Sequence, residues 1–160
     1  MDKVSIRRVV PADQPALVAF YAGLSAESRR ARFLGCSAGI GASCARAMCA
    51  ADHVHEEGFV ALATSTTGEA TVVGHVCILG TPQGRTELAI AVADEYQGHG
   101  IGSRLFRRAV AWARHSGLSS ITATAFTDNW RVIHLLGSAR RGIKMTPADA
   151  GVIEVAFKVA

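Results

Sequence analysis

The stretch Gln97-Gly98-His99-Gly100-Ile101-Gly102 lies between two segments of different periodicity, and these decide the fold. Residues 87–93 before it form a short apolar run that is typical of a buried strand. In residues 105–116 after it, apolar side chains recur at helical spacing beside several arginines. The sequence therefore predicts a strand, a glycine turn and a helix. Such a turn is a candidate anion site, because glycines let backbone N–H groups point inward and a helix N-terminus attracts negative charge.

Two other kinds of glycine turn fit this stretch less well. A dinucleotide-binding turn has the pattern G-x-G-x-x-G, but Ser103 stands where its third glycine belongs. That motif also follows the first strand of a βαβ unit, whereas this turn lies past the middle of the chain. A P-loop needs Gly-Lys followed by Ser or Thr, which the sequence lacks.

The pattern resembles the acyl-CoA signature of the GNAT superfamily of N-acetyltransferases, Q/R-x-x-G-x-G/A. Gln97, Gly100 and Gly102 fill its defined positions, and Val92 stands where the family has an apolar residue at the end of its fourth strand. Asn129 begins a later helix, as an Asn does in the family. The resemblance extends over about residues 4–157. It implies acetyl-CoA as the acyl donor and an amine as the acceptor.

The N-terminal half is similar to one branch of this superfamily, the GNAT domain of bacterial protein lysine acetyltransferases. The similar positions are Ile6-Arg7-Arg8, Asp13, Ala16, Leu17, residues 24–29 and Arg32-Phe33. This branch implies a protein lysine as the acceptor, with a small amine as the alternative.

Length and composition agree with one enzyme domain. The chain has 160 residues, within the usual range of one domain, and we expect residues 1–160 to form a single GNAT-type domain. No apolar run approaches the roughly 20 residues of a membrane helix, and the first residues do not resemble a signal peptide. The expected location is cytoplasmic, with no membrane partner.

Cysteine and histidine spacing does not indicate a metal site or a disulfide framework. The four cysteines contain no C-x-x-C pair, which predicts reduced thiols. His53 and His55, two residues apart, suit a loop or one strand face as well as a metal. We therefore expect no metal.

Basic side chains concentrate around and after the glycine turn, although the net charge is only +4. Between residues 97 and 146 the only acidic residue is Asp128. The basic ones are Arg104, Arg107, Arg108, Arg114, Arg131, Arg140, Arg141 and Lys144. This charge suits a ligand with several phosphates, such as coenzyme A, while a solvated helix face is the alternative. The sequence holds no recognised nucleic-acid motif, so no nucleic-acid partner is expected.

The remaining pattern predicts alternating strands and helices. The expected strands are residues 4–10, 59–64, 71–79, 87–93, 119–125 and 152–159. The expected helices are residues 11–22, residues 25–33, one helix from about residue 42, one after the glycine turn and one led by Asn129. Residues 66–69 predict a hairpin turn. Short turns before a βαβ-like centre favour an α/β (α+β) fold, a mixed and mostly antiparallel central sheet flanked by helices.

The reaction implied by the resemblance is direct attack of an amine on the thioester. Amines are mostly protonated at neutral pH, so a base must remove a proton. The resemblance implies Glu87 as this base, because the protein-acetylating branch has its base at a Glu ten residues before the Gln, which is Gln97 here. A strand-end carboxylate in a salt bridge is the alternative interpretation. The resemblance also assigns the N–H of Val92 to the thioester oxyanion, a form of stabilisation that needs little reorganisation.

The resemblance further implies a set of coenzyme-binding residues. Ile90 and Val92 would pair with the pantetheine arm, the turn would bind the pyrophosphate, and two arginines could contact phosphates. The full set is Ile90, Val92, Gln97, Gly98, His99, Gly100, Ile101, Gly102, Ser103, Arg104, Asn129 and Arg131.

The sequence departs from the family pattern at two places. Leu136 replaces the tyrosine that protonates the departing thiolate in many members, and His134 is a candidate substitute. Arg140-Arg141 replaces the family's Gly-Phe. A non-catalytic acyl-CoA-binding regulatory domain is therefore the alternative function, and a dinucleotide-binding enzyme is a third hypothesis. The acceptor's identity, the preferred acyl length and a homodimer are left open.

Overall fold

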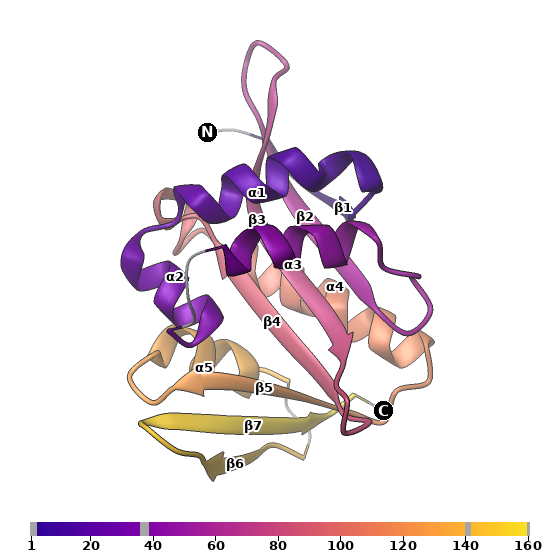
Figure 1. Ribbon diagram of the computed structural model, residues 1–160, viewed down its shortest axis with the longest axis vertical. Helices are drawn as coiled ribbons and strands as arrows, with labels where there is room; N and C mark the ends of the chain where they lie inside the picture. Colours follow the sequence, from indigo (N-terminus) through magenta and orange to yellow (C-terminus); the bar gives the residue numbers. More distant parts are fainter. Residues whose placement is uncertain (1–2, 36–38, 140–141, 160) are drawn as a thin grey trace.

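The computed structural model describes residues 3–35, 39–139 and 142–159 (Figure 1). Its strands are β1 (Lys3–Arg8), β2 (Glu57–Thr64), β3 (Ala70–Gly80), β4 (Thr86–Val92), β5 (Ser120–Phe126), β6 (Lys144–Pro147) and β7 (Val152–Lys158). Its helices are α1 (Gln14–Gly23), α2 (Ala26–Phe33), α3 (Ile40–Cys49), α4 (Ile101–His115) and α5 (Trp130–Gly137). Short 3₁₀ turns, η1 (Pro11–Asp13) and η2 (Asp94–Tyr96), precede α1 and follow β4.

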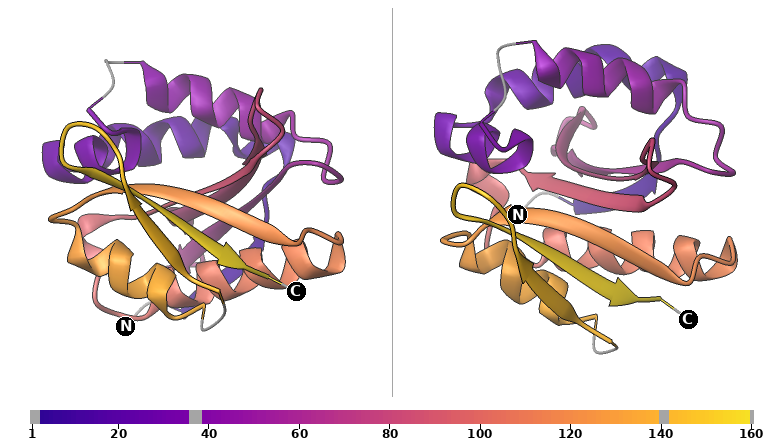
Figure 2. Two further views of the ribbon diagram at one scale, coloured as in Figure 1. Left: turned by 90° about the horizontal axis from the view of Figure 1, so that it is seen from below. Right: turned by 60° about the horizontal axis from the view of Figure 1, so that its bottom comes forward.

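The strands form one seven-stranded sheet in the order β1-β2-β3-β4-β5-β7-β6. Neighbours are antiparallel except for β4 and β5, which are parallel. Helices α1 and α3 cover one face of the sheet, while α4 and α5 lie on the other (Figure 2). The predicted mixed, mostly antiparallel sheet flanked by helices is confirmed.

Local sequence signals account for most of the element positions. The predicted hairpin joins β2 to β3, with pairing from Glu57↔Ile78 to Thr64↔Ala70. The hydroxyl of Ser25 accepts a hydrogen bond from the N–H of Ser28 at 3.1 Å and so caps α2, as its position before the helix predicts.

The short strand β6 has no counterpart among the predicted strands. All four of its residues are exposed, so no apolar alternation marks it. It exists because its backbone pairs with β7, from Lys144↔Ala156 to Pro147↔Ile153.

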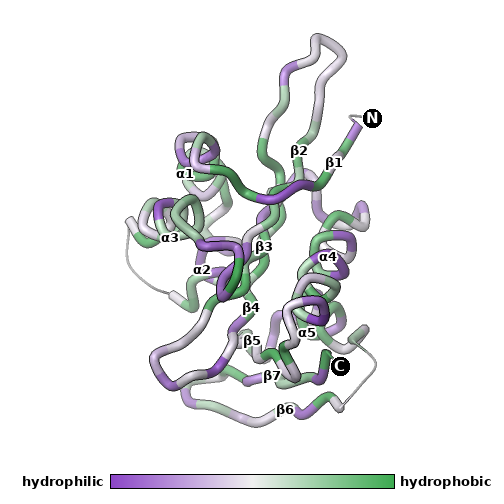
Figure 3. Tube along the Cα trace, turned by 90° about the vertical axis from the view of Figure 1, so that its right-hand side faces the viewer, coloured by the Kyte–Doolittle hydropathy of each residue, from purple (hydrophilic) through white to green (hydrophobic). Residues whose placement is uncertain are grey.

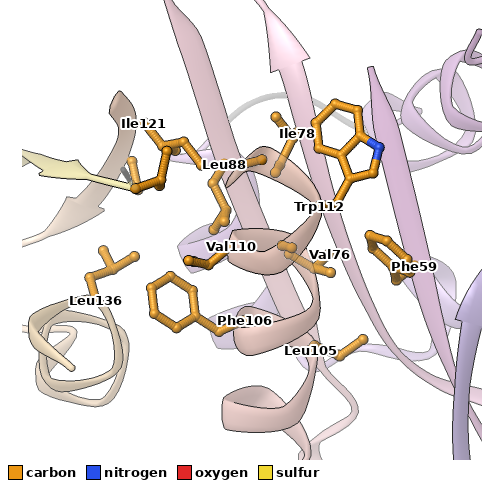
Figure 4. Close-up of a cluster of buried hydrophobic side chains, with 14 of the residues drawn as sticks. Phe59, Val76, Ile78, Leu88, Leu105, Phe106, Val110, Trp112, Ile121 and Leu136 are labelled. Carbon is orange, nitrogen blue, oxygen red and sulfur yellow. The ribbon is translucent and has the colours of Figure 1, made fainter. Parts of the chain in front are cut away.

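Helix α4 supplies much of the larger core. Its buried residues, Ile101, Leu105, Phe106, Ala109, Val110, Trp112 and Ala113, form one stripe toward the sheet. Hydrophobic and hydrophilic residues accordingly alternate around this helix (Figure 3). The stripe packs on side chains of β3 and β4 such as Val76, Ile78 and Leu88 (Figure 4). This packing holds the N-terminus of α4 beside the end of β4.

A second core lies on the opposite face, under α1 and α3. It includes Leu17, Phe20, Tyr21, Phe33 and Ala45. None of the helices in the described part of the chain has both the length and the apolar character that crossing a membrane requires.

Strands β4 and β5 are close at one end and diverge toward the other (Figure 1). Their pairing consists of Glu87↔Thr122, supported by a bond of 3.1 Å from the Thr122 hydroxyl to the carbonyl of Thr86. Helix α2 contacts both strands, and the guanidinium of Arg30 lies 3.8 Å from the ring centre of Phe126 at the end of β5.

Candidate active site

The C-terminal half of β4 has one edge that no strand in the described ranges pairs with. On the other edge, the N–H of Ala93 donates to the carbonyl of Val73 at 2.9 Å. Backbone groups of an antiparallel strand point alternately to its two edges, so the N–H groups of Ile90 and Val92 point away from β3. They face the side where β5 has diverged. This edge can therefore accept a ligand as an additional strand would pair with it.

The glycine turn begins α4 directly beside this edge. Gly98 and Gly100 have φ angles of +79° and +77°, and nothing lies within 4 Å of where a Cβ would stand. Glycine is needed there for its backbone conformation rather than for space. The side chain of Ile101 is buried in the core, whereas His99 and Ser103 are exposed. The first N–H groups of α4 have no partners within the helix, so they are free for an anion.

Gln97 connects the turn to β4. Its side-chain amide donates to the carbonyl of Val92 at 3.1 Å and to the hydroxyl of Ser28 at 3.2 Å. Its carbonyl oxygen accepts from Arg131 at 2.7 Å. The side chain of Gln97 thus holds the end of β4, the start of α2 and the start of α5 around one point.

Asp94 connects the same region to α2. Its carboxylate accepts from the N–H of Ser25 at 3.0 Å and from the hydroxyls of Ser25 and Ser28, both at 2.7 Å. Partial burial opposes ionisation, but these hydrogen bonds dominate and hold the pKa of Asp94 below its usual value.

Glu87 lies at a cavity on the opposite face of β4. Side chains alternate along a strand, so Glu87 and Ala89 share the face under α2 and α3, while Ile90 and Val92 pack toward α4. The cavity has a volume of about 330 Å³ and is lined by Arg32, Phe33, Ile40, Ser43, Cys44, Ala47, Met48, Leu79, Glu87 and Ala89. Within the described residues, the Glu87 carboxylate has no hydrogen bond or ion pair. It is half-buried and open to a molecule in this cavity.

Helix α5 brings Asn129 to the same region. The side-chain oxygen of Asn129 accepts from the N–H of Val132 at 3.3 Å, which caps the helix and leaves the side-chain NH₂ group available. Leu136 is fully buried in the core, and His134 is exposed on the same helix. Arg140 and Arg141 lie outside the described residues.

The two arginines expected at phosphates already contact the protein. Arg131 donates to Gln97 as above, and Arg104 donates to the carbonyl of Val4 in β1 at 3.0 Å. Their roles with a ligand stay predictions.

The histidines at residues 53 and 55 have separate carboxylate partners. His53 contacts Glu57 at 2.8 Å, and His55 contacts Asp52 at 2.8 Å. The structure does not bring these two side chains together as a shared site.

Sequence reasoning expected early helices of residues 23–57 at the acceptor side but assigned no site role to their individual residues. Arg32 and Cys44 line the Glu87 cavity from α2 and α3. Ser28 of α2 bonds to Asp94 and Gln97 after β4. All three lie more than 40 residues before the residues that they face. No spacing motif marks such contacts, since tertiary packing creates them. The Ser-Ala-Glu-Ser cap before α2 was the one available local signal.

Comparison with known proteins agrees with this geometry. The sequence model described as Acetyltransferase (GNAT) family matches residues 29–140. No curated protein matches the sequence.

Several solved structures share the fold. The GNAT domain of S. lividans PAT is 24% identical with a TM-score of 0.78, over 97% of this chain and 90% of that one. The putative acetyltransferase yncA from Salmonella typhimurium, solved with its cofactor acetyl-CoA, is 18% identical with a TM-score of 0.75, over 99% and 95%. Ribosomal-protein-S5-alanine acetyltransferase from Vibrio fischeri is 15% identical with a TM-score of 0.74, over 99% and 93%.

The family match covers more than half of the chain, and it includes the divergent strands, the glycine turn and the Asn-led helix described above. The chain therefore belongs to the acetyltransferase (GNAT) family and is an acyltransferase.

Proposed function

We propose that this protein transfers an acetyl group from acetyl-CoA to an amine, by direct attack of the amine on the thioester. The observation that carries the proposal is the open edge of β4 beside the N-terminus of α4. This edge suits an extended, amide-containing arm such as pantetheine, and the glycine turn suits the pyrophosphate to which that arm is joined.

In this proposal the donor lies between β4 and β5. The backbone of Ile90 and Val92 pairs with the pantetheine amides, and the side-chain NH₂ group of Asn129 binds the same arm from α5. The amides of residues 98–103 surround the pyrophosphate. The thioester carbonyl then lies at the N–H of Val92, which donates to the oxygen as negative charge develops there.

The acceptor amine enters from the cavity that holds Glu87. The Glu87 carboxylate removes a proton from the ammonium, directly or through water, and the neutral amine attacks the thioester carbon. A carbon–nitrogen bond forms, the bond to sulfur breaks, and the second proton that the nitrogen loses neutralises the departing thiolate. The departing thiol has an ordinary pKa of about 8.5, so it leaves without a dedicated acid, consistent with Leu136 at the family's tyrosine position.

A protein lysine is the proposed acceptor class. Support for it comes from the similarity of the N-terminal residues, Arg32-Phe33 included, to protein lysine acetyltransferases. Arg32 and Phe33 both line the cavity beside Glu87. A small amine is the competing acceptor, and parallel assays with lysine peptides and with small amines decide between them.

Calorimetric titration with acetyl-CoA, with NAD as the control ligand, tests the donor site. We expect micromolar binding of acetyl-CoA and no binding of NAD. Replacing Gly100 by Ala should weaken acetyl-CoA binding about tenfold or more, since Ala resists a φ of +77°.

The Gly68→Ala variant is the matched control. Gly68 has a φ of +88° in the turn between β2 and β3, with open space around it, so its replacement strains the backbone equally away from the site. Equal weakening by both variants, or binding of NAD alone, would contradict the proposed donor site. Tight acetyl-CoA binding without transfer to any amine would favour the non-catalytic regulatory domain, for which the buried Leu136 is the supporting observation.

A further inference from the structure

Arg32 places its guanidinium among sulfur atoms and aromatic rings beside the Glu87 cavity. Its Nη2 donates to the Sγ of Cys44 at 3.3 Å and to the Sγ of Cys77 at 3.4 Å. The guanidinium lies 4.7 Å from the ring centre of Phe33 and 5.6 Å from that of Tyr21. No carboxylate in the described ranges forms an ion pair with it.

A partly buried cation is stabilised by negative charge close to it, and the two thiols that Arg32 contacts can supply that charge. A hydrogen bond from Cys77 and the charge of Arg32 together outweigh burial and lower the pKa of Cys44. The hydrogen bond with Cys44 and burial raise the pKa of Cys77. Both shifts favour the thiolate at Cys44 over one at Cys77.

The two sulfur atoms are close enough to form a disulfide after a small movement. They lie within 4.8 Å of each other, from α3 and β3, whereas a disulfide bond is about 2 Å long. Cys44 lines the cavity and is reached from it, while Cys77 is fully buried behind Cys44. This is the arrangement of an attacking thiolate with a resolving thiol.

A metal site is less consistent with the same atoms. A ring nitrogen of His75 lies within the same 4.8 Å as the two sulfurs; its Nδ1 is hydrogen-bonded to the hydroxyl of Tyr21, and its Nε2 has no partner among the described residues. The guanidinium of Arg32 already contacts both sulfurs and would repel a second cation.

We propose that Cys44 and Cys77 form a dithiol site that a hydroperoxide entering the Glu87 cavity oxidises to a disulfide. The Cys44 thiolate attacks one peroxide oxygen, the O–O bond breaks, and the alcohol or water leaves after taking a proton. The sulfur becomes a sulfenic acid, oxidised by two electrons, and the peroxide is reduced. The Cys77 sulfur then attacks the Cys44 sulfur, the S–S bond forms, the S–O bond breaks, and the hydroxide leaves as water with the Cys77 proton.

The disulfide joins α3 to β3 at the inner end of the cavity. We therefore expect oxidation to reduce acetyl transfer, a consequence that rests on the function proposed above. The formation of the disulfide does not depend on that function, so the thiol measurements below and acetyl-CoA binding can fail separately.

The first experiment treats the folded Cys36→Ser variant with hydrogen peroxide and maps its peptides by mass. The replacement leaves Cys44, Cys49 and Cys77 as the cysteines of the protein. We expect Cys44 and Cys77 to be joined in one peptide pair, with Cys49 still a free thiol, and dithiothreitol to restore both thiols. Cys49 is the internal control, because it lies on the same helix and burial raises the pKa of its thiol.

Two further variants test the separate roles of Cys77 as the resolving thiol and of Arg32 as the charge beside Cys44. In Cys77→Ser, Cys44 should accumulate as a sulfenic acid that dimedone traps, with no disulfide. In Arg32→Gln, the pH midpoint for alkylation of Cys44 by iodoacetamide should rise by about 1–3 pH units, while that of Cys49 stays unchanged. If Arg32→Gln does not fold, the pH profiles of Cys44 and Cys49 within the unaltered protein provide the same comparison, with the lower midpoint expected for Cys44.

Three outcomes would overturn the proposal. One is that Cys44 reacts with peroxide only when urea unfolds the protein. A second is that Cys44 pairs with Cys49 or proceeds to a sulfinic acid while Cys77 remains a thiol. The third is stoichiometric binding of zinc that blocks alkylation of Cys44, which would identify the cluster as a metal site.

Discussion

At the scale of single residues, Glu87 and Val92 show how one strand serves two parts of a reaction. Side chains of β4 alternate between the faces of the sheet, and its backbone groups alternate between its edges. The carboxylate of Glu87 therefore faces the cavity under α2 and α3, while the N–H of Val92 faces the gap beside β5. The proposed base and the proposed oxyanion donor approach the reacting carbon from different directions.

Replacing Glu87 by Gln tests the proposed base. The amide keeps the shape of the side chain but cannot accept the proton, so we expect kcat to fall by about 10²–10⁴ at neutral pH. The calorimetric Kd for acetyl-CoA should not change. Glu69→Gln, at an exposed turn residue, is the control and should leave both quantities unaltered. Normal turnover of Glu87→Gln would remove Glu87 from this role.

At the scale of elements, α2 connects the two parts of the site. Its first residues bond to Asp94 after β4, and Arg30 packs on Phe126 at the end of β5. The helix thereby spans the place where the two strands separate. Arg32 near its other end lines the Glu87 cavity. A change at either end of α2 is consequently expected to affect the donor and acceptor sides together.

The Asp94→Asn variant measures how much the hydrogen bonds between Asp94 and α2 contribute to the free energy of unfolding. The variant loses charge-assisted hydrogen bonds to Ser25 and Ser28, and we expect the free energy of unfolding to fall by about 0.5–1.5 kcal/mol, because the carboxylate is exposed to solvent. Urea denaturation gives this value. Adding Ser28→Ala should cost less than the sum of the single effects, since the residues share a bond. Glu95→Gln, next in the chain and also exposed, should change stability by less than about 0.5 kcal/mol. An equal loss in Glu95→Gln would contradict the specific link through Asp94.

At the scale of the whole molecule, a buried histidine lies between the sheet and its α1–α3 layer. His75 on β3 is fully buried and bonds to Tyr21 of α1. Burial and the charge of Arg32, opposed by the charge of Asp13, lower the pKa of His75 to about 3. The imidazole is therefore neutral in the folded protein at neutral pH.

This histidine predicts how stability depends on pH. Below its ordinary pKa of about 6.5, the unfolded chain binds a proton at His75 that the folded chain excludes until about pH 3. The free energy of unfolding should thus decrease as the pH is lowered below about 6.5, by up to about 1.4 kcal/mol per pH unit. The hydrogen bond with Arg7 lowers the pKa of Asp13, which adds a similar loss only below about pH 4. Cys44, whose pKa is lowered to about 6, adds to the slope only near and above that pH. Urea denaturation between about pH 4.5 and 5.5 therefore reports mainly on His75. His75→Asn should reduce this slope, and the exposed-site control His115→Asn should keep it. An unchanged slope in His75→Asn would show that other groups cause it.

Prediction from the sequence succeeded where neighbouring residues determine the outcome. The hairpin around residues 66–69, the cap at Ser25 and the Asn129-led helix depend on contacts within a few residues, and their signals are local. It missed β6 because every side chain there is exposed and only the backbone ladder to β7 defines the strand.

By itself, the sequence determined the strand, glycine turn and helix of residues 87–115, since glycines at positive φ and the apolar stripe of α4 specify local geometry. The tertiary structure alone decided that β5 diverges from β4, that Arg131 donates to the side chain of Gln97, and that Arg32 contacts Cys44 and Cys77. The physical reason is the range of the interactions. Backbone conformation and periodicity act over a few residues, whereas the open strand edge and the partly buried cation arise from packing between segments 12 to 45 residues apart.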